Sequence, residues 1–176
     1  MTIKKSITIL GFIIFLIGVW LVGFATPVGA ETMKIRLHSL ATKVERVFIG
    51  DVEGHTLGLT VRRGILEFEN GENGTHISVI SSDTIKGTGS VLSYSTITFA
   101  DGSAIIAKSQ STLGGGTAVG AHTWSEGTGE IIKGTGRFEG IKGTQTTRMK
   151  YFPLEKGEDG PKAIGEITIN YTLPSK

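Results

Sequence analysis

Glu166-Ile167-Thr168-Ile169-Asn170-Tyr171-Thr172-Leu173 is the stretch that decides the fold. Apolar residues occupy every second position from Ile167 to Leu173, and polar residues fill the positions between them. Successive side chains of a β-strand point to opposite faces of a sheet. The alternation therefore predicts a strand with one face against a core.

The same period of two recurs from Met33 onward, and no stretch of ten residues carries apolar residues at helical spacing. A second strand region covers residues 57–68. Further strands are predicted at Lys34–Leu40, Val44–Ile49, His76–Ser82, Ser90–Phe99, Ala104–Ser109, Thr123–Ile132 and Thr144–Phe152. Eight to ten short strands at regular spacing are typical of an all-β barrel or sandwich.

Within residues 57–68 the apolar row changes face. It occupies odd numbers from Leu57 to Val61 and even numbers at Leu66 and Phe68. We expect the register to slip by one across Arg62-Arg63-Gly64, at a glycine-bearing bulge or tight bend that restores the facing.

Glycines mark the turns and favour closure of the sheet. Asn70-Gly71 and Asp101-Gly102 lie between strand-like runs and tolerate the positive φ of hairpin turns. Ile-Lys-Gly-Thr occurs at Ile85–Thr88, Ile132–Thr135 and Ile141–Thr144, which we interpret as one local bend used three times. Of the 146 residues after position 30, 22 are glycine. Such positions let a sheet bend sharply, so a closed antiparallel barrel of about eight strands is favoured over a sandwich.

The first thirty residues have the pattern of an export signal. Lys4 and Lys5 precede an apolar run from Ile7 to Ala25, and Val28-Gly29-Ala30 supplies the small residues that a signal peptidase reads. An uncleaved membrane anchor at residues 7–25 is the competing interpretation, because the run is long enough to cross a bilayer. Either way a β-barrel domain is expected at 31–176, in a secreted or periplasmic location or tethered to a membrane only through this segment.

Composition excludes several classes of function. The 176 residues contain no cysteine, which rules out a disulfide scaffold and a thiol enzyme. Residues 31–176 carry 16 basic and 16 acidic side chains, so no basic surface for nucleic acid is expected. The four histidines lack metal-ligand spacing, and the glycine-rich stretches lack the spacing of phosphate-binding loops. We predict no metal site and no cofactor.

Gly134-Thr135-Gly136-Arg137-Phe138-Glu139-Gly140-Ile141-Lys142-Gly143 resembles the G-[ST]-G-x-F-x-G-x-x-G stretch of the allene oxide cyclase barrel family. It is more loosely similar to the G-G-T-G-x-F segment of plant dirigent proteins. Asp51–Gly58, Phe68–Gly71 and Thr98–Ser103 resemble exported bacterial relatives of uncharacterised role. The resemblance covers most of 43–172. It implies an eight-stranded barrel, which in related proteins often assembles as a trimer.

The resemblance also suggests a chemistry. Plant allene oxide cyclases bind an unsaturated fatty-acid epoxide in an apolar cavity, with a glutamate, a bound water and a cysteine. This chain has no cysteine, and the glutamate has three counterparts in the right region, Glu45, Asp51 and Glu53. The fold therefore carries over more readily than the activity.

The sharpest catalytic candidates are Asp51, Glu53 and His55. On an extended strand these alternating residues project to one side, where a carboxylate orients the imidazole for acid–base chemistry. The alternative is a solvated strand end, with Gly54 marking a turn.

Seven aromatic residues, spread over the predicted strands and the Gly134–Gly143 stretch, are candidates for the barrel interior. They either fill the barrel or line a small ligand cavity: Phe48, Phe68, Tyr94, Phe99, Trp124, Phe138 and Tyr171.

Three functions follow. The first is an exported binding or interaction module for a small lipophilic molecule. The second is an isomerase or cyclase acting on an unsaturated lipid-like substrate inside the barrel, with Glu53 or a neighbour moving the proton. The third is a structural barrel without ligand, as part of a homo-oligomer.

Overall fold

The computed structural model describes residues 29–115, 122–154, 156–157 and 160–175. The predicted apolar segment of the signal or anchor lies outside these residues. Within them, no helix has the length and apolar character needed to span a bilayer.

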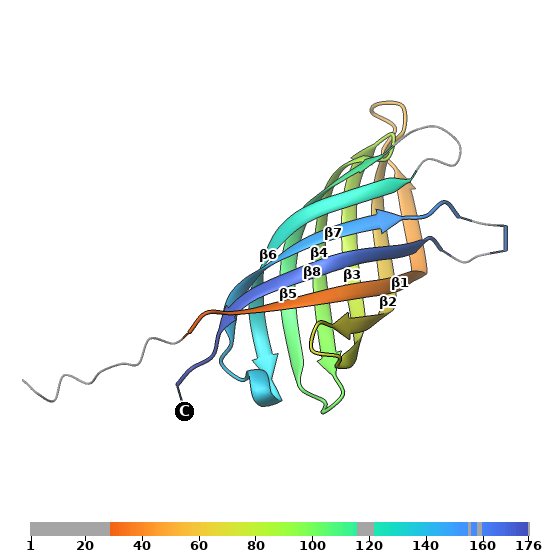
Figure 1. The fold of residues 1–176 in the computed structure, drawn as a ribbon. Helices are drawn as coiled ribbons and strands as arrows, with labels where there is room; N and C mark the ends of the chain where they lie inside the picture. The colour runs from red at the N-terminus through yellow and green to blue at the C-terminus, as the bar shows by residue number, and fades with distance from the viewer. Residues whose placement is uncertain (1–28, 116–121, 155, 158–159, 176) are drawn as a thin grey trace, which may run out of the picture.

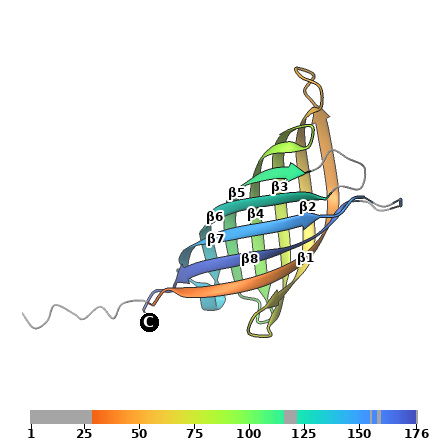
Figure 2. The same ribbon diagram turned by 45° about the horizontal axis from the view of Figure 1, so that its top comes forward.

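Eight antiparallel strands pair in chain order, and β8 pairs with β1 to close the barrel. The expected closed antiparallel barrel of about eight strands is therefore confirmed. Figures 1 and 2 show the strands wrapping around one axis. Their bounds are β1 Glu31–Phe48, β2 His55–Phe68, β3 Asn73–Ile85, β4 Thr88–Phe99, β5 Ala104–Gly115, β6 Thr123–Thr135, β7 Lys142–Tyr151 and β8 Lys162–Thr172.

The barrel has two unlike ends. At the terminal end, the β2–β3 and β4–β5 turns and the 3₁₀ turn η2 (Gly136–Phe138) lie at the same end of the barrel as Glu31 and Thr172, in the lower part of Figure 1. The β1–β2 turn and the β3–β4 turn lie at the opposite end.

The predicted register slip in residues 57–68 is wrong, because the irregularity lies in a different strand. The irregularity is in β1, between Ala41 and Lys43, and β2 runs through Arg62 with continuous pairing to β3. The two predicted strands at 34–40 and 44–49 are therefore one bulged strand. In β2 the odd-numbered apolar row faces out throughout, whereas Arg62, Leu66 and Phe68 are buried on the other face.

Both predicted glycine turns are confirmed, with Gly71 and Gly102 at φ of 83° and 82°. The repeated Ile-Lys-Gly-Thr bend is wrong for two of its three copies. Only Gly87 sits in a turn with positive φ. Gly134 lies within β6, where an added Cβ would meet the Phe138 carbonyl oxygen, and Gly143 lies within β7 against the Asn170 oxygen. Those two glycines serve close backbone approach.

An apolar core fills the terminal half of the interior. The Phe68 and Phe99 rings stack with centroids 4.7 Å apart, and Phe99 and Phe138 follow at 4.6 Å. Tyr171 meets the edge of Phe138 at 6.2 Å. Leu66, Ile97, Ile105 and Ile169 are fully buried around this aromatic row. Side chains therefore fill the interior of the barrel in its terminal half, beneath the mouth at that end.

Candidate functional site

The predicted acid–base trio does not lie on an extended strand. Asp51 and Glu53 are in the β1–β2 turn, and His55 opens β2. His55 Nδ1 lies 2.6 Å from Asp51 Oδ1, so the predicted carboxylate–imidazole pair exists. His55 Nε2 lies 2.9 Å from Asp83 Oδ1, a partner on β3 that sequence reasoning missed. Hydrogen bonds to Asp83 and then to Asp51 raise the pKa of His55.

This arrangement ties the β1–β2 turn to β3. Both ring nitrogens of His55 are engaged by carboxylates, so neither is available to exchange a proton with a substrate. Glu53 is not among the described hydrogen-bond partners of His55. Its side chain is 89% exposed and pairs with Lys86 Nζ at 3.1 Å. The trio therefore lies outside the barrel interior.

Glu53→Gln should leave folding intact. The substitution removes one exposed ion pair, and such pairs contribute little to stability. We expect the urea midpoint of the variant to match that of the unmodified chain. Lys86→Met, which removes the other partner, should behave in the same way. A Glu53→Gln loss of stability as large as that of a core truncation would contradict this placement.

The aromatic candidates divide into two groups. Phe68, Phe99, Phe138 and Tyr171 are buried and converge at the terminal end. The predicted interior placement of Phe48, Tyr94 and Trp124 is wrong, because these side chains are 78%, 46% and 49% exposed.

Strand alternation explains the exposed group. In β4 the odd-numbered residues Ser95, Ile97 and Phe99 are the buried ones, which turns Tyr94 outward. Trp124 likewise neighbours the buried Ser125 in β6. Its indole packs over Gly114, where a Cβ would lie 2.7 Å from the ring.

The buried aromatic residues form the floor of a pocket of about 470 Å³ at the terminal end, hereafter the end pocket. Met33 and Leu173 add apolar walls. Polar walls come from the β2–β3 turn and from β1. The lining residues are Thr32, Met33, Lys34, Phe68, Glu69, Asn70, Glu72, Phe99, Arg137, Phe138, Tyr171 and Leu173.

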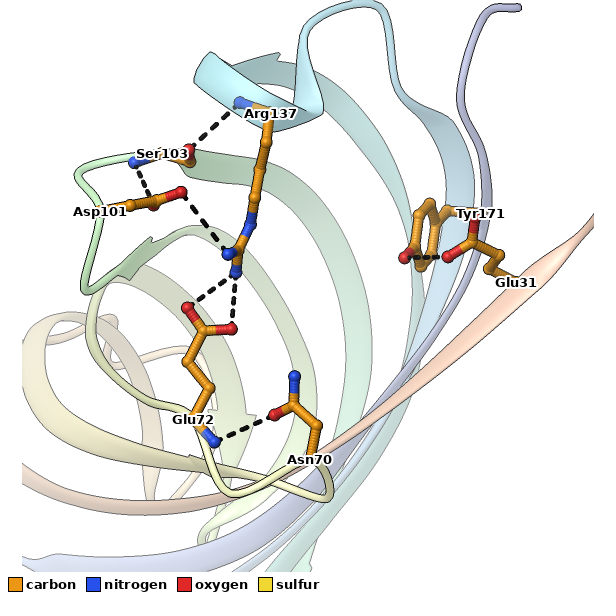
Figure 3. A network of polar contacts seen from close by, with 7 residues as sticks. All are labelled: Glu31, Asn70, Glu72, Asp101, Ser103, Arg137 and Tyr171. Atoms are coloured by element: carbon orange, nitrogen blue, oxygen red, sulfur yellow. Dashed lines mark hydrogen bonds and ion pairs between the residues drawn. The ribbon is translucent and has the colours of Figure 1, made fainter.

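Arg137 organises one wall of the end pocket (Figure 3). Its Nη2 donates to both carboxylate oxygens of Glu72, at 2.8 and 2.6 Å, and its Nη1 lies 3.5 Å from Asp101 Oδ2. The guanidinium lies over the rings of Phe99 and Phe138, at 4.6 and 5.0 Å from their centroids. The contacts join three turns, and cation–π packing holds the charge against the aromatic floor.

Tyr171 supplies a second polar group in the end pocket (Figure 3). Its hydroxyl donates to Glu31 Oε2 at 2.6 Å. Burial, assisted by the Glu31 carboxylate, raises the pKa of Tyr171 to about 12. The phenol is therefore neutral and a hydrogen-bond donor across the physiological range.

A second hollow lies in the opposite half of the barrel. It is a cavity of about 60 Å³, hereafter the inner cavity, and polar side chains from seven strands surround it. Its lining residues are Leu37, Ser39, Arg62, His76, Ser78, Ile80, Val91, Ser93, Ser95, Ser111, Ser125, Gln145, Thr147, Met149, Tyr151 and Ile167.

The inner cavity contains a buried cation. Arg62 is only 4% exposed, and burial lowers its pKa, although arginine stays protonated at neutral pH. His76 is 6% exposed, and burial, assisted by the Arg62 charge, lowers the pKa of His76 to about 4. The imidazole is therefore neutral at pH 7.

Sequence reasoning missed the inner cavity because it followed apolar rows. Arg62 belongs to the inward row of β2 with Leu66 and Phe68, and Ser93 and Ser95 form an inward pair on β4. Serine alternating with larger residues in a strand is the signal that points to a polar interior. Among the described residues, no group of three histidines or carboxylates is placed to hold a metal ion.

The chain matches no family model and no curated protein. Solved structures similar to it include that of the pterocarpan synthase dirigent protein PsPTS1, with a TM-score of 0.49 and 14% identity over 84% of this chain and 97% of that chain. The pterocarpan synthase dirigent protein GePTS1 is another, with a TM-score of 0.48 and 13% identity over 88% of this chain and 94% of that one. The dirigent and the allene oxide cyclase resemblances of the sequence both stay predictions.

Proposed function

We propose that this chain is an exported β-barrel binding module that takes a small lipophilic molecule in the end pocket. The observation that carries the proposal is the end pocket itself, about 470 Å³ in volume, with an aromatic floor. Small-molecule sites typically enclose about 300–1,000 Å³ and combine apolar walls with a few placed polar groups.

The end pocket suits an amphipathic ligand. Met33, Leu173 and the aromatic floor remove apolar ligand surface from water, which contributes about 25 cal/mol per Å². Arg137 presents a fixed guanidinium donor, and the Tyr171 hydroxyl oxygen, whose proton goes to Glu31, presents an acceptor at the same place. A ligand with an apolar body and a polar group that both accepts and donates can use both.

The cyclase interpretation has weaker support. Asp51 and Glu53 belong to the turn at the opposite end of the barrel, away from the end pocket. Export rests on the sequence of residues 1–30, and assembly into a homo-oligomer rests on the family resemblance. Both belong to the proposal.

Binding of 1-anilinonaphthalene-8-sulfonate, an amphipathic fluorescent anion, tests the end pocket. We expect the full-length chain to bind this probe saturably. Leu173→Glu should weaken binding about tenfold or more, because it places a charge on an apolar wall. Leu154→Glu makes the same change on an exposed residue of the β7–β8 connection and should leave binding unchanged. Equal binding by both variants, or no saturable binding, would overturn the proposal.

A further inference from the structure

Arg62 is a buried charge with only neutral partners in the described part of the chain. Its Nη2 donates to the Pro161 carbonyl oxygen at 2.8 Å and its Nε to Ser39 Oγ at 3.3 Å. The face of the Tyr151 ring lies 5.1 Å from the guanidinium carbon. Arg62 forms no ion pair with any carboxylate of the described residues. Neutral acceptors repay only part of the cost of removing such a charge from water.

Two more polar atoms in the same cavity lack partners. His76 Nδ1 and Gln145 Oε1 are buried, and neither has a hydrogen-bond partner among the described residues. Their side chains are 6% and 3% exposed. Buried polar atoms in folded proteins are nearly always paired, so an unpaired set around one cavity indicates that something occupies it.

The lining and the size define the occupant. The inner cavity is lined by hydroxyl, amide, imidazole and guanidinium groups together with apolar side chains, and no carboxylate of the described residues is among them. A volume of about 60 Å³ has room for a few water-sized groups and not for a lipid. Water completes hydrogen bonds but leaves the Arg62 charge without a counter-charge from the described residues. A planar anion of three or four heavy atoms offsets that charge and accepts from the His76 ring, and the arginine fork matches a carboxylate in geometry. Gln145 Oε1 is an acceptor, so a water beside the anion donates to it.

We propose that the inner cavity is a binding site for a small carboxylate anion of the size of formate or acetate. The carboxylate oxygens accept hydrogen bonds from the Arg62 guanidinium, the His76 ring and a serine hydroxyl of the wall. This site lies in the other half of the barrel from the end pocket, and it does not depend on a ligand being bound there.

NMR of the His76 ring in the full-length chain tests this site, in a buffer free of carboxylate and with formate as the probe. We expect a saturable shift of the His76 resonances and a rise in the pKa of His76 from about 4, because the bound anion offsets the neighbouring positive charge. Formamide is the neutral match of formate and should bind at least about tenfold more weakly. Acetate should behave as formate does.

Two variants complete the test. Arg62→Gln should abolish the formate response, whereas Arg63→Gln removes the same charge from an exposed neighbour and should leave it unchanged. The unmodified chain alone decides the matter if Arg62→Gln does not fold. No saturable shift with formate, an equal response to formamide, or equal losses in the two variants would overturn the proposal.

Discussion

Replacing Phe138 by alanine should lower the free energy of unfolding by about 3–5 kcal/mol, the usual cost of truncating a buried phenylalanine. Phe138 is 4% exposed and sits between Phe99 and Tyr171 in the aromatic row of the core. Truncation removes both ring contacts and leaves a cavity that the rigid barrel wall cannot close. It also takes away one of the two rings that hold the Arg137 guanidinium. Urea unfolding followed by circular dichroism measures the change.

Phe48→Ala is the matched control for this prediction. Phe48 is the same residue type at the end of β1, but 78% of it is exposed. Its truncation removes little buried surface, so the unfolding free energy should change by no more than about 0.5 kcal/mol. Comparable losses for Phe48→Ala and Phe138→Ala would mean that the core does not lie at the terminal end.

The contrast between Phe48 and Phe138 also shows how much of the fold can be predicted from the sequence. Period-two alternation, as in Ile167 and Ile169, predicts the strands because it reports directly on facing. Glycine content predicts closure because bends at close approach need it, as at Gly134. Residue type alone does not predict which aromatic residues are inside. Facing follows the register of each strand, and Tyr94 and Trp124 fall on outward positions.

Less of the candidate sites than of the fold could be predicted from the sequence, for a related reason. The end pocket could be predicted in part, since four of the seven aromatic candidates line it. Arg137 could not, because its partners Glu72 and Asp101 belong to turns far away in the chain. The inner cavity depends on polar side chains from seven strands that meet only when the barrel closes. A search for apolar rows passes over Arg62 and His76.

Acidification from pH 6.5 to about 4 should destabilise the fold through His76. The pKa of His76 is about 4 in the folded chain, below the ordinary value of 6.5 for an unfolded histidine. In this interval the unfolded chain takes up a proton that the folded chain does not. The stability from a neutral His76 is therefore fully present above pH 6.5 and is lost as the pH falls. One proton gives a slope of about 1.4 kcal/mol per pH unit, or about 3 kcal/mol in total.

Two other groups with shifted pKa values, His55 and Asp51, change the stability of the fold at other pH values. The pKa of His55 is raised by its two carboxylate partners, so its contribution is complete below pH 6.5 and fades as the pH rises through its folded value. The pKa of Asp51 is lowered, chiefly by the hydrogen bond to His55. Its contribution is lost only in acid below the ordinary carboxylate range. The interval between pH 4 and 6.5 therefore isolates His76.

His76→Gln should flatten the stability profile over this interval, because glutamine does not titrate. His38→Gln is the control: His38 is half exposed on the outer wall of β1, and its replacement should preserve the slope. Urea unfolding at several pH values, in a buffer free of carboxylate, measures both profiles. A carboxylate bound beside Arg62 raises the pKa of His76, so adding formate should make the slope of the unmodified chain shallower. A slope that survives in His76→Gln would show that the buried imidazole is not its source.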